Sequence, residues 1–450
     1  MNAKWFRSVW TCGLALSAAL AAAEDSKLVV RDVNVSFAAK GTMNDRSSFR
    51  GSLPGVVLSQ RPAPAKPSEA KPQPVGVMTF EGTPTENVDL LLEYDGSARM
   101  LARWPHVEQR STRTLWRNVD LVNSQAAPTS PFPANSWLNP LRSADRLSLS
   151  FDQKIEKFVL YDMTLRAPNS VELEAADTGY KARNAGTSAI HDVTVYRPTG
   201  DGKYRAAYIS TIPGVAKPAV APDAAKPPMP AAVPAAKPAP NLAVAALQAI
   251  VGTTPAPTQV VPPAAPNAAP AAAPAPTTPQ HDINWAGEAQ TPEELVAAWE
   301  PLLAAQGLGT AEIAHVQSIL RAYSFDKDSA RVVFRIDPAT IETLAPLEVS
   351  PQPDKIQRVW LVILDGADPE IKTRINKLIA ALGENSYEKR MEAKAELLKL
   401  GPTAVPQLSA EKANKDAEIS FRIEEILEEV QNPTDQQNPN EAVIGIEIDG

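Results

Sequence analysis

The sequence predicts a multi-domain protein with an N-terminal all-β sandwich and a C-terminal α+β domain that ends in a helical unit. Three observations predict this fold class. Strand-like runs follow one another through residues 77–213, alanine and proline dominate 214–280, and apolar residues take helical spacing after residue 367. Strands that recur about every 8 to 12 residues between turn signals are typical of antiparallel sandwiches.

Shifts in composition divide the chain into eight expected segments. Between residues 221 and 270, 30 of 50 residues are alanine or proline and none is aromatic, so this stretch cannot offset its own ordering entropy. The expected segments are a signal peptide (1–23), an N-terminal β segment (24–60), a short Pro-rich linker (61–76), a β-sandwich domain (77–213), an Ala/Pro-rich disordered linker (214–280), a small α+β domain (281–366), a helical unit (367–432) and a polar tail with a terminal strand (433–450).

The first 23 residues have the pattern of a secretory signal peptide. Lys4 and Arg7 precede a short apolar run, which ends in three alanines at 21–23. This order of charged, apolar and small residues predicts cleavage and an extracytoplasmic product, either periplasmic or secreted. Cys12 is the only cysteine and lies inside the peptide, so we expect no disulfide and no cysteine-based metal site in the mature chain.

The front half carries repeated strand signals. The alternation of VNVSF predicts a strand over 33–37, and Asp95-Gly96 between two strand-like runs predicts a hairpin within 87–104. A second hairpin is expected within 147–165, around Asp152-Gln153-Lys154. Further strands are expected over 171–175, 191–197 and 204–211.

One part of this half is similar to a known domain type. Residues 180–209 contain a strand, the turn Asn184-Ala185-Gly186 and a second strand that begins with Asp192-Val193-Thr194-Val195. The pattern resembles the core of the bacterial immunoglobulin-like domains of surface and adhesion proteins. The resemblance implies an immunoglobulin-like sandwich and carries no catalytic motif.

The α+β domain begins with two expected helices, over 291–308 and 310–323. Thr291, Pro292 and Glu294 form the pattern of a capping box with proline in the first turn. Two alternating runs then predict strands over 330–337 and 356–364.

The helical unit is predicted from two apolar stripes and a joint between them. Gly401 is expected to end a helix over 386–400, Pro402 to start the next helix, and Pro406 to bend it. The stripes have the spacing i, i+4, i+7, i+8 and i+11, and consist of Ile371, Ile375, Leu378, Ile379 and Leu382, and of Ile419, Ile423, Ile426, Leu427 and Val430.

This tail resembles a HEAT-like repeat. Ser420 and Ile423 depart from the usual pattern, which has a basic and a small residue at these positions. The resemblance implies a helical interaction surface and no chemistry. Because stacked repeats need about three copies, one unit must pack on the preceding domain, which we favour, or on a partner. The residues that carry the resemblance are Leu397, Leu400-Gly401-Pro402, Ala404, Val405-Pro406, Leu408, Asp416, Ile419 and Arg422.

One group of residues could form a binding surface. Arginines and tryptophans interleave over 99–118, and exposed tryptophan beside arginine could stack on sugars or hold anionic polymers. The other interpretation, which we favour, is that the tryptophans fill the sandwich core while the arginines cover strand edges. The candidate binding residues are Arg103, Trp104, Arg113, Trp116 and Trp137.

Signals for catalysis and for nucleic-acid binding are weak. The four histidines lack metal-ligand spacing such as HExxH, and Ser188, His191 and Asp192 are too close in sequence to align as a triad. Residues 281–450 hold 16 basic and 30 acidic side chains, which disfavours nucleic acid as a partner. We expect no cofactor, no metal and no transmembrane segment in the mature chain.

Together these observations favour an exported, non-enzymatic interaction or scaffold protein that binds other proteins or cell-envelope components. The first alternative is a glycan- or anionic-polymer-binding protein that uses the arginine and tryptophan residues above. The second alternative is a hydrolase whose site is assembled from distant carboxylates.

Overall fold

The computed structural model describes most of the chain outside its ends and the Ala/Pro-rich segment. The expected signal peptide (1–23), most of the long linker and the polar tail with its terminal strand lie outside the described residues. The described residues are 28–39, 53–54, 56–59, 72–94, 98–105, 108–110, 112–123, 125, 127–164, 170–176, 179–215, 279–285 and 287–431.

Three sheets form the β-rich part. The largest, here called the central sheet, has nine strands in the order β14 (Tyr204–Ile212), β13 (Ile190–Pro198), β16 (Arg331–Ile336), β18 (Lys355–Asp365), β1 (Val29–Ala39), β3 (Gly76–Glu81), β10 (Val159–Thr164), β5 (Arg99–Trp104) and β2 (Leu58–Ser59). A six-stranded sheet contains β17 (Leu347–Ser350), β4 (Thr85–Glu93), β7 (Arg113–Val122), β8 (Ser148–Phe151) and β9 (Lys154–Glu156), with β6 (Glu108–Arg110) paired to β7. A three-stranded sheet contains β11 (Val171–Ala176), β12 (Gly179–Asn184) and β15 (His281–Asn284).

The helices follow in two groups. The first group is α2 (Asn139–Arg142), α3 (Pro292–Ala297), α4 (Glu300–Ala305), α5 (Thr310–Tyr323) and α6 (Pro338–Leu344). The second group, here called the helical unit, is α7 (Pro369–Ala381), α8 (Tyr387–Leu400), the 3-10 helix η1 (Gly401–Ala404), α9 (Val405–Ala410) and α10 (Ala417–Gln431). The expectation of a β-rich front region and a helical end is confirmed. We call the three sheets with α2–α6 the sheet body.

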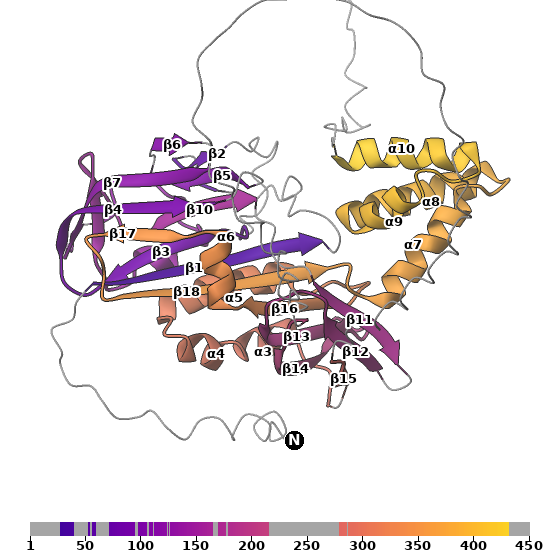
Figure 1. Cartoon of the computed structure of the whole chain (residues 1–450), viewed down its shortest axis with the longest axis horizontal. Coiled ribbons are helices and arrows are strands. Elements are labelled where there is room, and N and C mark those ends of the chain that lie inside the picture. Colours follow the sequence, from indigo (N-terminus) through magenta and orange to yellow (C-terminus); the bar gives the residue numbers. More distant parts are fainter. Residues whose placement is uncertain are drawn as a thin grey trace, which may run out of the picture. The chain divides into compact units, whose positions relative to one another are not determined.

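The central sheet takes strands from both halves of the sequence. β1 and β18 pair in parallel along their whole length, from Val29 opposite Lys355 to Ala39 opposite Asp365 (Figure 1). The expected separation into a sandwich at 77–213 and an independent α+β domain at 281–366 is therefore wrong. The physical reason is visible in β18, where every residue from 359 to 364 is buried. A strand that is apolar on both faces needs cover on both faces, so it lies inside a shared sheet.

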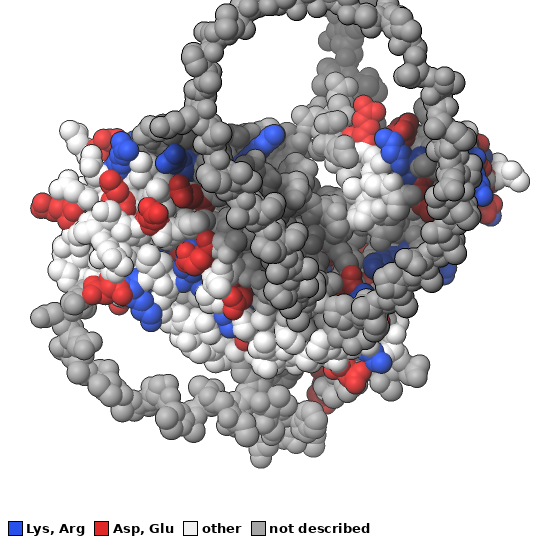
Figure 2. Space-filling model, viewed as in Figure 1, with Lys and Arg blue, Asp and Glu red and all other residues white. Residues whose placement is uncertain are grey.

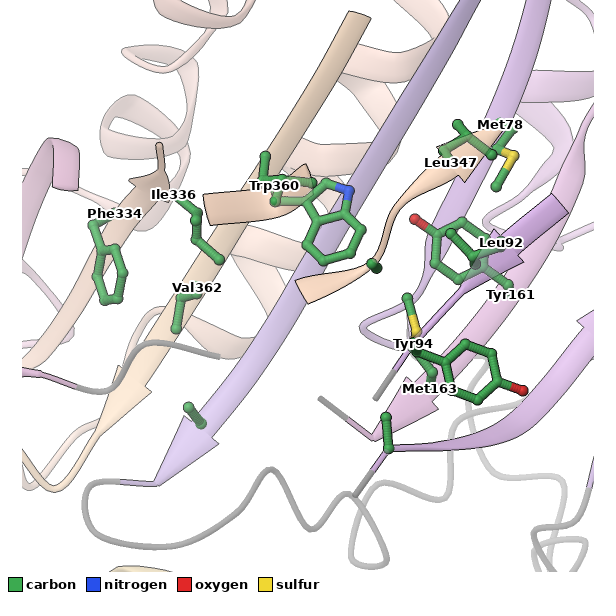
Figure 3. Close-up of a cluster of buried hydrophobic side chains, with 14 of the residues drawn as sticks. Met78, Leu92, Tyr94, Tyr161, Met163, Phe334, Ile336, Leu347, Trp360 and Val362 are labelled. Atoms are coloured by element: carbon green, nitrogen blue, oxygen red, sulfur yellow. The ribbon is translucent and has the colours of Figure 1, made fainter. Parts of the chain in front are cut away.

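Each face of the central sheet has its own core. On one face, Trp360 and Val362 of β18 join side chains of the other two sheets. The close-up in Figure 3 shows Leu92 and Leu347 of the six-stranded sheet beside Tyr161 of the central sheet. On the other face, residues of β18 such as Leu361 pack with helices α2 to α5. The sheet body therefore has helices α2 to α5 against one face of its central sheet, and further strands together with α6 against the other.

The two expected hairpins have different outcomes. The hairpin at Asp95-Gly96 is wrong, because β4 belongs to the six-stranded sheet and β5 to the central sheet. These two strands are consecutive in sequence but belong to different sheets, so they do not pair with each other. The second hairpin is confirmed: β8 pairs with β9, and Asp152 and Gln153 have φ angles of 43° and 61°. Positive φ at both central residues matches the twist of a two-residue hairpin.

Helix boundaries agree closely with the sequence patterns. The helix expected over 310–323 is α5, and the capping box of Thr291 with Glu294 is present. The helix expected over 291–308 is divided into α3 and α4, since Pro301 lies in the first turn of α4 and its ring cannot continue the preceding helix. Pro406 likewise lies in the first turn of α9, so the bend expected there is wrong.

Candidate interaction surface

The tryptophans of the predicted binding surface are part of the cores. Trp116 belongs to the core on one face of the central sheet, whereas Trp104 and Trp137 belong to the core on the other. The Nε1 of Trp104 donates to Glu156 at 3.2 Å, and the ring of Trp137 stacks on His315 with centroids 5.3 Å apart. The core interpretation of these tryptophans is confirmed, and their ring faces are covered.

The two arginines of that surface are also separated. Arg103 lies on β5 of the central sheet and is buried, whereas Arg113 lies on β7 of the six-stranded sheet and is exposed. The five residues Arg103, Trp104, Arg113, Trp116 and Trp137 therefore do not form one surface for a ligand. The exposed Arg-Trp stacking site expected as an alternative is not formed.

The histidine and carboxylates near residue 191 serve as structural partners. His191 Nε2 lies 3.3 Å from Asp337 Oδ1, while Asp192 Oδ2 accepts a hydrogen bond from Arg335 Nε at 2.6 Å. Neither contact involves Ser188, which is exposed in the turn before β13. Within the residues that the structure describes, no three histidine or carboxylate side chains are placed to hold a metal ion.

The highly exposed large apolar side chains of the described residues lie on two helices. Among the described residues, the large apolar side chains with high exposure are Tyr387 at 63%, Phe421 at 68% and Met391 at 39%. Tyr387 and Met391 lie on α8, and Phe421 lies on α10. All three therefore belong to the helical unit, whereas no large apolar side chain described in the sheet body is exposed to this degree.

The helical unit has a core of its own, built from the two predicted stripes. Ile375, Leu397 and Ile423, from three different helices, are fully buried together. Local signals fix the helix ends: the Asp368 side chain accepts from the Glu370 N–H at the start of α7, and Gly401 has a φ of 51° after α8. The core holds its three helices in place, so the side chains on the outside of α8 and α10 have defined positions.

Ion pairs across α8 and α10 show how the two helices lie relative to each other. Arg390 Nε is 3.7 Å from Glu418, and Lys394 Nζ is 3.0 Å from Glu425. From the first pair to the second, the residue numbers rise on both helices, from 390 to 394 on α8 and from 418 to 425 on α10. The two helices run in the same direction, and the level of Met391 on α8 corresponds to that of Phe421 on α10.

Helical geometry places the three exposed side chains on one side. Successive residues of a helix are rotated by about 100°, so Tyr387 and Met391 lie about 60° and 100° from Arg390, away from buried Ala393. On α10, Phe421 lies about 60° from Glu418, away from buried Ile426. All three therefore lie just outside the row of ion pairs. We call this surface, with Tyr387, Met391 and Phe421 beside the Arg390–Glu418 and Lys394–Glu425 pairs, the α8–α10 face.

Hydrogen bonds attach the helical unit to the sheet body. Asp368, buried at the start of α7, accepts from the Ala330 backbone N–H at 2.7 Å and from the Tyr180 hydroxyl at 3.0 Å. Burial, together with the negative charge of Asp368, raises the pKa of Tyr180, so this hydroxyl remains a proton donor at neutral pH. Thr403 donates to Asp365 at 2.6 Å. The helical unit packs on its own chain, the arrangement that the sequence favours.

A polar cavity of about 420 Å³ lies beside this attachment. Its charged walls are largely paired with one another: Arg331 binds Asp326 at 2.9 Å, and Arg374 lies 2.5 Å from Glu396. Because these charges already have partners, few of them are free to bind a ligand in the cavity. The α8–α10 face, with its exposed apolar side chains, is therefore the stronger candidate for a binding site.

No family model, curated protein or solved structure matches this chain. In the part of the chain that the structure describes, no helix is both long enough and apolar enough to cross a bilayer. Lysines, arginines and carboxylates are interspersed on the face seen in Figure 2 rather than gathered into one basic patch.

Sequence patterns did not identify Tyr387, Met391 or Phe421 as site residues. Stripe analysis finds the buried side of a helix, and these residues lie outside the stripes. The signal that could have found them is a large apolar residue among charged residues, as in YEKRME and SFRIEE.

Proposed function

We propose that this chain is an exported, non-enzymatic interaction or scaffold protein that binds another protein through the α8–α10 face. The observation that carries this proposal is that Tyr387, Met391 and Phe421, the highly exposed large apolar side chains of the described residues, all lie on the neighbouring helices α8 and α10. Tyrosine, phenylalanine and methionine are enriched in protein interfaces, where a few such side chains supply most of the binding energy. An exposed apolar patch framed by polar residues is typical of such sites.

The HEAT-like interpretation of residues 367–432 supports the same function. The Gly401 turn, the short α9 and the start of α10, where the Asp416 side chain accepts from the Glu418 N–H at 2.9 Å, agree with a helix–turn–helix repeat unit. Repeat units of this kind present their helices as binding surfaces. The immunoglobulin-like interpretation of 180–209 carries less weight, because β13 pairs there with β16 from the far half of the chain.

Export is proposed from the pattern of residues 1–23 alone. Binding partners are then to be sought among proteins and other components of the cell envelope.

The proposal is tested by a triple variant, Tyr387→Ser, Met391→Ser and Phe421→Ser, used as bait against an envelope fraction. Removing three interface anchors is expected to weaken retention of the partner by at least about tenfold. The matched control carries Glu86→Ser, Arg205→Ser and Glu348→Ser, three exposed positions in the sheet body. Equal retention of the same proteins by both variants would contradict the proposal.

A further inference from the structure

The α8–α10 face is framed by carboxylates on both helices. Helices α8 and α10 carry eight glutamates against five cations, and six of the eight glutamates are exposed. The glutamates are Glu388, Glu392, Glu396, Glu418, Glu424, Glu425, Glu428 and Glu429, and the cations are Lys389, Arg390, Lys394, Lys399 and Arg422.

The cations of this surface already have partners within the chain. Arg390 and Arg422 both pair with Glu418, and Lys394 lies between Glu425 and Glu429. Lys412 is 3.5 Å from Glu424. In the described part of the chain, no ion pair involves Glu392 or Glu428, which lie on the outer sides of α8 and α10. The surface therefore combines three apolar anchors with a surplus of negative charge.

We infer that the α8–α10 face binds a cationic amphipathic helix of a partner protein. This inference rests on the proposed function and names the class of partner. Tyr387 and Met391 are one turn apart on α8, about 6 Å along the axis, which matches the i and i+4 spacing of apolar residues on a partner helix. Lysine and arginine on the flanks of such a helix can lay their aliphatic stems over Phe421 while their charged ends reach Glu392 and Glu428.

Charge disfavours the other occupants of this surface. A second copy of the chain, docked face to face about a two-fold axis, would place Glu392 and Glu428 against the equivalent glutamates of its partner. Nucleic acids and anionic lipid surfaces carry negative charge and are repelled by the same carboxylates. A basic partner helix with an apolar stripe can cover the three exposed apolar side chains and also neutralise the carboxylates around them.

The inference is tested with the full chain and two labelled helical peptides of 18 residues, one of leucine and lysine and one of leucine and glutamate with the same pattern. In fluorescence anisotropy, the lysine peptide is expected to bind at least tenfold more tightly than the glutamate peptide and to weaken as NaCl rises. The variant Glu392→Lys with Glu428→Lys is expected to weaken the lysine peptide at least tenfold. The matched control, Glu86→Lys with Glu348→Lys, changes the same charge on the sheet body and is expected to bind like the wild type.

The outcomes separate this inference from the proposed function. One outcome is that the triple serine variant loses its envelope partner while the variant Glu392→Lys with Glu428→Lys binds the lysine peptide as the wild type does. In that case the face binds a protein, but the inferred class of partner is wrong. If the wild type does not distinguish the two peptides, the inference is also overturned. Self-association of the wild type that Phe421→Ser abolishes would identify a second copy as the occupant instead.

Discussion

The sheet body and the helical unit place charge and apolar area in opposite ways. The sheet body buries whole ion pairs, such as Asp32 with Arg358, and none of its described large apolar side chains is highly exposed. The helical unit has its ion pairs at the surface, as in Arg374 with Glu396, and leaves three large apolar side chains in water. This contrast indicates a division of roles, in which the sheet body supports and the helical unit presents a surface.

Several hydrogen bonds support the buried pair of the sheet body. Asp32 Oδ2 accepts from Arg358 Nε at 2.9 Å and from Trp360 Nε1 at 3.0 Å, and its other oxygen accepts from the Tyr161 hydroxyl. Burial opposes the charge of Arg358, but the neighbouring Asp32 outweighs it and holds the pKa of the guanidinium above its ordinary value. Arg358 also donates to the Ala345 carbonyl at 2.7 Å, so the pair links β1, β18 and the end of α6.

The largest predicted effect comes from breaking this pair. Arg358→Leu leaves the Asp32 carboxylate buried without its countercharge, and we expect the free energy of unfolding to fall by about 3 to 5 kcal/mol. Urea denaturation at pH 7 measures this. The matched control is Arg374→Leu in the helical unit, where the pair is partly exposed to solvent and the expected loss is below about 1 kcal/mol. Similar losses in the two variants would remove the contrast between the two regions.

A second prediction concerns independence of the helical unit. Leu397 is fully buried in a core made of nearby segments, so Leu397→Ala is expected to cost about 2 to 5 kcal/mol. Because this core is local, we expect hydrogen exchange to accelerate in α7 to α10 while β1 and β18 keep their protection. The control Leu361→Ala, in the shared central sheet, should accelerate exchange in strands from both halves of the sequence. Loss of protection in β1 after Leu397→Ala would show that the two regions unfold together.

The same contrast explains how much of the fold could be predicted. Helices depend on neighbours three and four residues away, so α5 and the stripes of α7 and α10 could be predicted from local spacing. Strand existence was also predictable. The pairing of β1 with β18 was not, because it joins strands from opposite halves of the chain and leaves no local signal.

The position of Gly76 shows what local patterns miss in the sheet body. A Cβ at Gly76 would lie 2.1 Å from the Tyr161 ring, so β3 needs glycine where β10 brings this tyrosine. Sequence alone shows a glycine before a strand. At the candidate site, residue type predicted that tryptophans fill a core, but exposure decides which apolar residues are free to bind, and exposure depends on the packing of α8 against α10.

The last prediction concerns His315, on α5 of the sheet body. Its ring is buried against Trp137, and neither ring nitrogen has a hydrogen-bond partner among the described residues. Burial lowers the pKa of His315 to about 4, although nearby Glu312 acts in the opposite direction. The unfolded chain takes up this proton near pH 6.5 and the folded chain only near pH 4. Stability is therefore expected to fall by about 3 kcal/mol as the pH drops from about 7 to 4.

His315→Phe keeps an aromatic ring against Trp137 and removes the proton site, so it is expected to flatten the dependence between pH 4.5 and 7 in urea denaturation. Below that range, carboxylates titrate in both proteins and the curves should again run in parallel. The helical unit contains no histidine between residues 367 and 431. Hydrogen exchange at pH 5 should therefore show lost protection in α5 of the wild type relative to His315→Phe, with α8 and α10 unchanged. If the phenylalanine variant keeps the pH dependence of the wild type, groups other than His315 cause the acid sensitivity. The sheet body would then differ from the helical unit in no histidine-dependent loss of stability.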